Sequence, residues 1–545
     1  MRHRRPIRRP SKWLAASAAG LLGLAACQAE DAPVSDPDPA EGAVPELGAV
    51  EFTTSCSPQV EARLEEGLLL LHHMMYAQAQ EAFLEAVAVE EECAMAHWGV
   101  AMARFQPLWG SADVEGGREP AERAVALDPP TERERAYARS ALAFYEDPDA
   151  GLSERIERWE AAMEELYELV PEDLEAASLY ALAHLAVDPA DPDRQERAIG
   201  ILDRVHEELP EHPGAIHYGI HAHDVDARAE AGVRFAAAYQ DIAPTVPHAL
   251  HMPSHIYVRI GDWDAVIDWN RRSADAALEA PVNGYISHHH PHALDYLMYG
   301  YLQRGEDEAA REVLEELRSR EGYQPTFISG YALGAIPARW HVERRDWDGA
   351  SELEPRLPED FPWDDFPAAE AMTHVARGLG AARTGDASAA RASAERLGEL
   401  ELRARDRQDA YWGDWIAVQR RSVAAWAAFA EGDVEGAVEE MRTAAELEEA
   451  MEKHPITPGD LQPAYELLGD LLLEAGRPGE ALEAYQTSLE TWPNRYHTLL
   501  GAARVADEIG DDEAASRYYG ELAELAGDAA PEREGAAEAR ERAGR

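Results

Sequence analysis

Residues 248–263 read His248-Ala-Leu-His251-Met-Pro-Ser-His255-Ile-Tyr-Val-Arg-Ile-Gly261-Asp262-Trp263. His251 and His255 are spaced so that on a helix they lie one turn apart on the same face. The same pair of histidines occurs 34 residues earlier, at His217 and His221. A spacing of this length is the period of a helix–turn–helix repeat, so both pairs are expected on equivalent helices of a repeating fold.

Turn residues recur along the chain in the same way. Gly476 and Gly510 are 34 residues apart, and each is followed by an alanine and then a tyrosine at matching offsets. Small residues are needed where the two helices of a hairpin cross closely. Apolar residues recur every three or four positions and no alternating strand pattern is found. The sequence therefore predicts an all-α fold, a tetratricopeptide-repeat (TPR-like) helical solenoid.

Composition divides the chain into six segments. The first 26 residues combine a basic start with a short apolar run, which predicts a lipoprotein signal peptide. The next segment is acidic, rich in proline and poor in large apolar residues, which predicts a flexible tether. The predicted segments are the signal peptide 1–26, the tether 27–51, a His-rich TPR-like block 52–355, a Pro-rich linker 356–367, a C-terminal TPR block 368–527 and a charged tail 528–545.

The end of the signal segment, Leu24-Ala25-Ala26-Cys27, resembles the bacterial lipoprotein box. The resemblance implies cleavage before Cys27 and attachment of lipid to its thiol. Gln28 follows in place of an aspartate, which favours the outer membrane, on its periplasmic face. Membrane contact is then expected only through the N-terminal lipid. The alternative is ordinary secretion of a soluble protein.

Two further cysteines, Cys56 and Cys93, flank a predicted helical hairpin. An oxidising periplasm permits a disulfide bond between them, because the hairpin can bring its two ends together. The alternative is a pair of separate buried thiols.

The net charge narrows the choice of partners. The chain has 104 acidic and 50 basic residues, a formal charge of −54. Nucleic acid is excluded as a partner, because binding it requires Lys and Arg to neutralise phosphates. An acidic surface of this density attracts cations. The sequence also contains no phosphate-binding glycine loop, nucleophile elbow or dinucleotide fingerprint.

Three motifs resemble those of a group of exported bacterial TPR proteins and lipoproteins. They are Cys93-Ala-Met-Ala-His97-Trp98-Gly99, His251-Met-Pro-Ser-His255 and His292-Ala-Leu-Asp295-Tyr296. The resemblance covers roughly residues 52–525. It implies a fold and an exported location, and no particular activity.

The repeated histidines define the candidate site. With Gly261 at the usual turn position of a TPR, His251 and His255 fall where TPR proteins face their concave groove. Side chains from adjacent helices, which lie about 8–10 Å apart, can converge on one ion. The predicted metal ligands are His217, His221, His251, His255, Asp224 and Asp295, and the predicted groove residues are Tyr180, His184, His292 and Tyr299.

Imidazole and carboxylate donors suit Zn, Fe, Mn or Cu, and the absence of cysteine there argues against a thiolate site. Repeat duplication alone can also propagate a histidine pair, so a polar groove without metal and purely structural histidines stay open. A single site requires the four repeated histidines to converge. His288-His289-His290 is predicted to lie in a solvated loop, with covering the groove or supplying another ligand as the alternatives. His72-His73 is predicted to have a packing or surface role.

The resulting functional hypothesis is an envelope-anchored TPR lipoprotein. It binds a peptide, protein or glycan through the His-rich concave groove, with zinc or a transition metal at its centre. A metal-dependent hydrolase or oxidase that uses the same histidines is the first alternative, since an open coordination position can activate water. A metal-free protein-interaction scaffold is the second. No catalytic residue is identified from the sequence.

Overall fold

The computed structural model describes residues 47–147, 149–225, 227–407, 410–527 and 533–543. The predicted signal peptide, the lipid-bearing Cys27 and most of the predicted tether lie outside these residues. Within them, no helix combines the length and the apolar character needed to cross a membrane.

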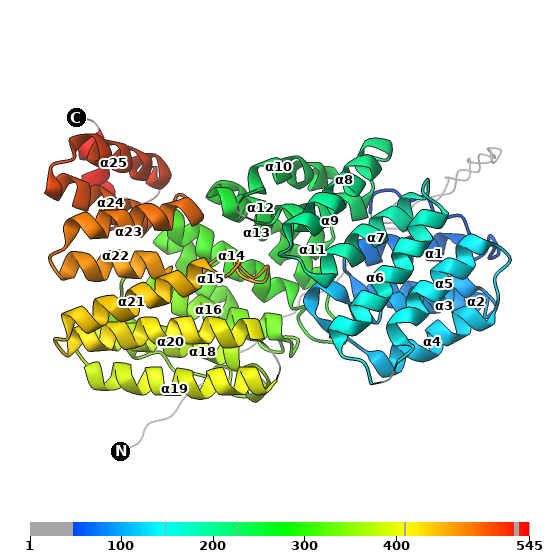
Figure 1. The fold of residues 1–545 in the computed structure, drawn as a ribbon, viewed down its shortest axis with the longest axis horizontal. Coiled ribbons are helices and arrows are strands. Elements are labelled where there is room, and N and C mark those ends of the chain that lie inside the picture. The colour runs from blue at the N-terminus through cyan, green and yellow to red at the C-terminus, as the bar shows by residue number, and fades with distance from the viewer. Residues whose placement is uncertain (1–46, 148, 226, 408–409, 528–532, 544–545) are drawn as a thin grey trace, which may run out of the picture. The chain divides into compact units, whose positions relative to one another are not determined.

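Helices form most of the described chain (Figure 1). The first repeats contain α1 (Glu61–His72), α2 (Tyr76–Val89), α3 (Ala94–Met102), α4 (Val114–Ala126), α5 (Glu132–Tyr145), α6 (Leu152–Leu169), α7 (Leu174–Val187) and α8 (Pro192–Glu208). The middle contains α9 (Pro213–His223), α10 (Ala229–Ala238), α11 (Pro247–His251), α12 (Pro253–Ile260), α13 (Trp263–Glu279), α14 (His289–Arg304), α15 (Asp307–Arg318), α16 (Phe327–Val342) and α17 (Trp347–Ser351). The last repeats contain α18 (Pro367–Arg383), α19 (Ala387–Asp406), α20 (Ala410–Ala430), α21 (Val434–Glu449), α22 (Ala464–Glu474), α23 (Pro478–Thr491), α24 (Tyr496–Ile509), α25 (Asp512–Ala526) and α26 (Ala536–Ala543).

Short elements connect some of these helices. A two-stranded antiparallel ribbon pairs β1 (Phe105–Gln106) with β2 (Ser111–Ala112) around the 3₁₀ turn η1 (Pro107–Trp109). Two further 3₁₀ turns are η2 (Tyr239–Asp241) and η3 (Trp363–Asp365).

Consecutive helices pack as antiparallel hairpins, and each hairpin packs on the next. The first helices of neighbouring hairpins also contact one another, for example α7 with α9, α9 with α12, and α20 with α22. This arrangement is typical of TPR stacking. The prediction of an all-α, TPR-like helical solenoid is confirmed.

The Gly-Asp turns of the sequence have a local structural cause. Gly261 ends α12 with φ of 69°, a left-handed conformation that closes the helix at little steric cost. Asp262 then caps α13, its carboxylate accepting a hydrogen bond from the backbone amide of Ala265 at 3.1 Å. The same aspartate cap begins α19, α21 and α25, through Asp386, Asp433 and Asp511.

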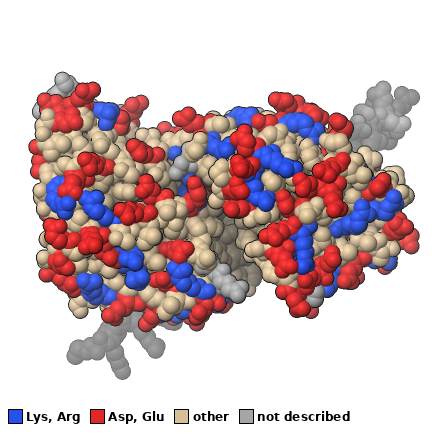
Figure 2. All heavy atoms as spheres, in the orientation of Figure 1, with Lys and Arg blue, Asp and Glu red and all other residues tan. Residues whose placement is uncertain are grey.

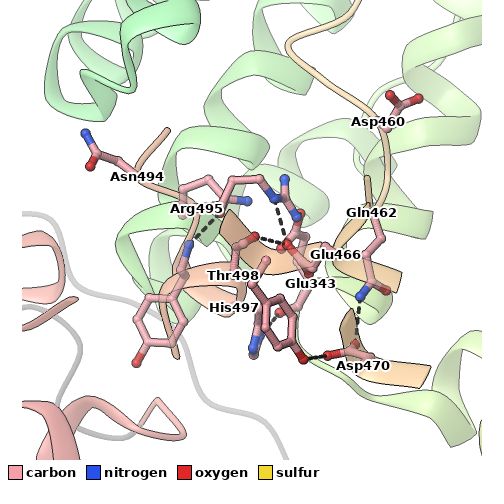
Figure 3. Close-up of polar contacts among 12 residues, drawn as sticks. Glu343, Asp460, Gln462, Glu466, Asp470, Asn494, Arg495, His497 and Thr498 are labelled. Atoms are coloured by element: carbon pink, nitrogen blue, oxygen red, sulfur yellow. Dashed lines mark hydrogen bonds and ion pairs between the residues drawn. The ribbon is translucent and has the colours of Figure 1, made fainter. Parts of the chain in front are cut away.

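The two predicted TPR blocks belong to one compact unit. Arg495, next to the start of α24, is fully buried and donates hydrogen bonds to Glu466 at 3.0 Å and to Glu343 at 2.7 Å (Figure 3). It also donates to the hydroxyl of Tyr299 at 2.5 Å. Glu466 lies in the C-terminal block, whereas Glu343 and Tyr299 lie in the His-rich block. A buried guanidinium with this set of acceptors joins the two blocks through charge-assisted hydrogen bonds.

Parts of three predicted segments are more ordered than the sequence suggested, because their side chains or backbone groups pack against the helices. Residues 47–51 do not belong to the flexible tether, since Leu47 is buried and the amide of Ala49 donates to the carbonyl of Glu211. The linker 356–367 buries Phe361 and Trp363 against α14–α16. Residues 533–543 of the predicted tail include α26, which packs on α25.

Acidic side chains cover much of the face shown in Figure 2, interspersed with a smaller number of basic ones.

Cys56 and Cys93 form a disulfide bond with Cα atoms 5.2 Å apart. The bond links the segment before α1 to the N-cap residue of α3, which is Cys93.

The hairpin of α1 and α2 packs on α3 through one phenylalanine held between two glycines. A Cβ atom added at Gly99 would lie 2.3 Å from the ring of Phe83, and one added at Gly67 would lie 2.7 Å from the same ring. Phe83 is fully buried, so the ring has no free space into which to move.

We therefore expect Gly99→Ala to destabilise the protein by about 1–3 kcal/mol through overpacking. Gly200→Ala is the matched control, because Gly200 is exposed on α8 and an added Cβ there meets no atom within 4 Å. The control should be neutral or slightly stabilising, since alanine is the better helix former. Denaturant unfolding of both variants measures the difference, and equal effects would contradict the packing account.

Candidate metal centre

The histidine pairs lie on α9, α11 and α12. α9 carries His217 and His221, and its first turn begins with Pro213, which suits the start of a helix. α11 ends at His251 and α12 begins at Pro253, because proline cannot donate the hydrogen bond that would continue a single helix. Met252 between them keeps helical angles, so the rings of His251 and His255 remain 4.8 Å apart.

Three imidazoles converge at the centre of this region. One ring nitrogen from each of His217, His221 and His248 lies within 4.8 Å of the other two. His217 and His248 are buried and His221 is partly buried. Nε2 of His217, Nε2 of His221 and both ring nitrogens of His248 have no hydrogen-bond partner among the described protein groups. Buried polar atoms are nearly always partnered, so this cluster needs a specific explanation.

A backbone contact sets the orientation of the first ring. Nδ1 of His217 lies 2.6 Å from the carbonyl oxygen of His72, at the end of α1, and must donate to it. Nε2 of His217 is then the bare, unprotonated nitrogen, and it is the atom that faces the cluster. A metal-ligating histidine usually has this arrangement, with its other ring nitrogen donating to a carbonyl.

The environment keeps these histidines neutral. Burial, together with the neighbouring histidines, holds the pKa of His217 and of His248 well below the ordinary value, and burial lowers the pKa of His221 to about 3. Neutral imidazole is the form that binds a metal ion. The cluster therefore presents ligand nitrogens at neutral pH without first having to lose protons.

The second predicted pair lies beside this cluster. Nε2 of His251 is 3.1 Å from Nε2 of His255, and Nδ1 of His255 is 3.0 Å from a carboxylate oxygen of Asp224. Asp224 also receives Arg259 at 2.9 Å and Lys453 at 3.5 Å. Burial alone would raise the pKa of Asp224, but Lys453 and Arg259 lower it below the ordinary value.

The predicted ligand set is corrected by these positions. The four repeated histidines do not share one centre: His217 and His221 converge with His248, and His251 pairs with His255. Asp295 is not beside them, because it is fully buried in an ion pair with Arg339 at 2.8 Å. Asp224 contacts Nδ1 of His255, the ring nitrogen that faces away from His251. It therefore orients this ring and is not a member of the three-imidazole set.

The predicted groove residues also separate. His292 lies in the cluster, its ring centre 4.2 Å from that of His251. Tyr180 donates to Glu164 and His184 contacts Glu160 at 2.7 Å, both on α6. Tyr299 accepts from Arg495. Of the four predicted groove residues, His292 therefore extends the histidine cluster, and Tyr180, His184 and Tyr299 have partners elsewhere.

A second group, His72, Glu175 and His212, also has ligand atoms within 4.8 Å of one another. Here both nitrogens of His72 have partners: Nε2 is 2.7 Å from Glu175, and the hydroxyl of Tyr218 is 2.9 Å from Nδ1. The amide of Ala215 donates to Nδ1 of His212, and Nε2 of His212 lies 3.2 Å from the carboxylate of Glu175 without a well-aligned hydrogen bond. This group is a hydrogen-bonded core network, so the packing role predicted for His72 agrees with its position.

Two features of the site were missed from the sequence. His248 does not repeat at the 34-residue period, and only its place one turn before His251 could have suggested it. His289 and His290 are buried at the start of α14, with His289 5.1 Å from His248 by ring centres, so the solvated-loop prediction is wrong for these two residues. The period marks equivalent helices, but tertiary packing decides which side chains meet.

The loop between α21 and α22 packs against the middle repeats. The hydroxyl of Tyr296 donates to the carbonyl of Pro455 at 3.0 Å, and Arg339 donates to the carbonyls of Gly459 and Asp460. Lys453 from the same loop is buried beside Asp224. The loop thus contacts α14 and α16 directly and brings a cation to Asp224.

Comparison with known proteins gives little information. No protein-family model matches the chain, and no curated protein matches it. Among solved structures, the chain is similar to one described as "Crystal structure of APC/C hetero-tetramer Cut9-Hcn1". The identity is 12%, the match covers 90% of this chain and 97% of that chain, and the TM-score is 0.26. A likeness at this level carries no argument about function, so the site is interpreted from its own geometry.

Buried neutral histidines outside the cluster make stability depend on pH. His73 is fully buried between the hydroxyl of Tyr239 and the carbonyl of Leu47, and burial lowers its pKa to about 4. The unfolded chain has an ordinary histidine pKa of about 6.5, so between these values it binds more protons than the folded chain. Stability from this group is therefore full above pH 6.5 and is lost as the pH falls.

From pH 6.5 to pH 5.0, His73 should cost about 2 kcal/mol of unfolding free energy. His73→Gln keeps a donor for Leu47 and removes the titrating ring. Denaturant unfolding in the presence of a chelator measures the unfolding free energy at pH 7 and at pH 5. Between these two pH values the variant should lose about 2 kcal/mol less of this free energy than the parent protein. The same pH dependence in both proteins would contradict the assignment.

Proposed function

We propose that the protein binds a zinc or late transition-metal ion through His217, His221 and His248. The observation that carries the proposal is the set of unpartnered imidazole nitrogens within 4.8 Å of one another. Three histidine ligands leave a fourth position for water or a bound molecule in a tetrahedral site. His221 is only partly buried, so this side of the site is the one nearest solvent.

The donor chemistry selects the class of ion. Imidazole suits zinc, copper, iron and nickel, whereas magnesium, calcium and manganese prefer carboxylate and carbonyl oxygens. No carboxylate belongs to the three-residue set, and Asp224 is already paired with two cations. Of the ions predicted from the sequence, the all-nitrogen set supports zinc, copper or iron and disfavours manganese.

The competing hypotheses differ in what they require of the concave side. A peptide-binding scaffold needs an open groove, whereas the loop 451–463 packs against the middle repeats through hydrogen bonds with Tyr296 and Arg339. A hydrolase or oxidase needs the ion with its open position, so metal binding is the step that both catalytic hypotheses share. An exported, lipid-anchored location fits the proposal, because residues 1–27 predict it and an oxidising compartment allows the Cys56–Cys93 bond.

The test is the metal content of the untagged chain, as purified and after chelation and reloading with Zn²⁺ or Co²⁺. His217→Asn removes Nε2 but keeps a donor near the position of Nδ1 for the carbonyl of His72. We expect at least one ion per chain in the parent protein and the loss of one ion in the variant, because a two-imidazole remnant binds far more weakly.

The matched control is His341→Asn, which makes the same chemical change at a histidine whose Nδ1 contacts Asp346 outside the cluster. The control should retain the parent metal content. If His217→Asn also retains it, while folding normally by circular dichroism, His217 is not a ligand and the proposal fails.

Stability in the absence of metal gives an independent prediction. His248 buries two unpartnered nitrogens, a cost of about 1–3 kcal/mol for each unsatisfied group. His248→Phe keeps a ring of similar size and removes both nitrogens. In chelator the variant should unfold at a higher denaturant concentration than the parent, yet it should bind one ion fewer. A clear loss of stability in chelator would show that the His248 nitrogens have stabilising partners.

A further inference from the structure

The contact between His251 and His255 presents a separate problem in hydrogen bonding. The side-chain amide of Asn270 donates to the carbonyl of Val266 at 2.8 Å, so its oxygen is the atom that faces His251. That oxygen lies 2.7 Å from Nδ1 of His251. An amide oxygen can only accept, and Nδ1 of His251 must therefore carry the proton.

The same reasoning fixes the proton of His255. Asp224 is held ionised by Lys453 and Arg259, and an ionised carboxylate can only accept. Its oxygen lies 3.0 Å from Nδ1 of His255, which must donate to it. In neutral rings both Nε2 atoms are then unprotonated, and their lone pairs face each other at 3.1 Å.

Two bare nitrogens at this distance repel unless a cation lies between them. A proton is one candidate, but Lys453 and Arg259 beside Asp224 oppose a further positive charge shared in this way. Zinc–nitrogen bonds of about 2.0–2.1 Å put two tetrahedral ligand atoms about 3.3 Å apart, close to the separation found here.

We propose that His251 and His255 bind a second metal ion through their Nε2 atoms, next to the ion of the three-imidazole site. His292 packs beside this pair, with its ring centre 4.2 Å from that of His251, and the two Nε2 atoms are the protein ligands that the geometry supports. The proposal deepens the proposed function and rests on it for the first ion. The two sets are neighbours, since the rings of His221 and His255 are 5.8 Å apart and those of His248 and His251 are 6.2 Å apart.

The outer contacts support this assignment. Both ligand histidines have their Nδ1 atoms held by acceptors, Asn270 for His251 and Asp224 for His255. Such contacts fix ring orientation in metal sites and increase the basicity of the ligand nitrogen. Lys453 and Arg259 hold Asp224 in place from two other elements, the 451–463 loop and α12. The pair is therefore preorganised before any ion arrives.

Two ions in adjacent all-histidine sites define the class of centre. Neighbouring metal ions can bind one bridging ligand between them, such as hydroxide or a small dioxygen-like or phosphate-like molecule. The two ligand sets together contain five histidines from α9, α11 and α12, which are His217, His221, His248, His251 and His255.

The experiment measures the stoichiometry of Co²⁺ and Zn²⁺ bound to the untagged chain after chelation and reloading. The variants are His255→Asn, which keeps a donor for Asp224, and His251→Asn, which keeps a donor for Asn270. Both lose only Nε2. His217→Asn removes the first site and His341→Asn is the control. We expect two ions in the parent and control proteins and one ion in each of the other three variants.

A spectroscopic readout separates a ligand role from a structural one. Loading with Cu²⁺ should give a spin-coupled electron paramagnetic resonance signal in the parent, and an uncoupled single-ion signal in His255→Asn and in His217→Asn. A protein that merely lost packing would not convert a coupled signal into an isolated one.

The outcomes distinguish the two proposals. One ion in the parent, retained in His255→Asn and His251→Asn but lost in His217→Asn, overturns the second site and leaves the first, with a shared proton between His251 and His255. One ion lost in His255→Asn but retained in His217→Asn overturns the three-imidazole site instead. No ion in the parent after reloading overturns both.

Discussion

Unpartnered polar atoms in a protein interior cost free energy, and the helices around His217 bury several of them in one small volume. Nε2 of His217, Nε2 of His221 and both nitrogens of His248 lack partners among the described groups. The free energy lost by burying these nitrogens without partners must be offset by another interaction, and coordination of an ion supplies one. The neighbouring network shows the contrast, because both nitrogens of His72 have hydrogen-bond partners and His212 lies beside the carboxylate of Glu175.

The repeat architecture explains how the histidines reach one place. Each TPR-like hairpin sets its first helix beside the first helix of the next, so α9, α11, α12 and α14 face a common side. The 451–463 loop packs against the middle repeats and brings Lys453 to Asp224.

Much of the fold followed from the sequence, because helical periodicity and Gly-Asp turns are local signals. The turn at Gly261 and Asp262 is one example, with its left-handed glycine and aspartate cap. The site followed only in part. The 34-residue period located His217, His221, His251 and His255, but His248 has no counterpart in that period, and Asp295 is paired with Arg339 from α16, 44 residues later. Such long-range partners carry no local sequence signal.

The most direct test of the account is a crystal structure of the untagged chain with anomalous diffraction data above and below a metal absorption edge. The account predicts an anomalous peak within coordination distance of Nε2 of His217, Nε2 of His221 and a ring nitrogen of His248. Ordered water molecules hydrogen-bonded to these nitrogens, with no anomalous peak after reloading with zinc or cobalt, would contradict it.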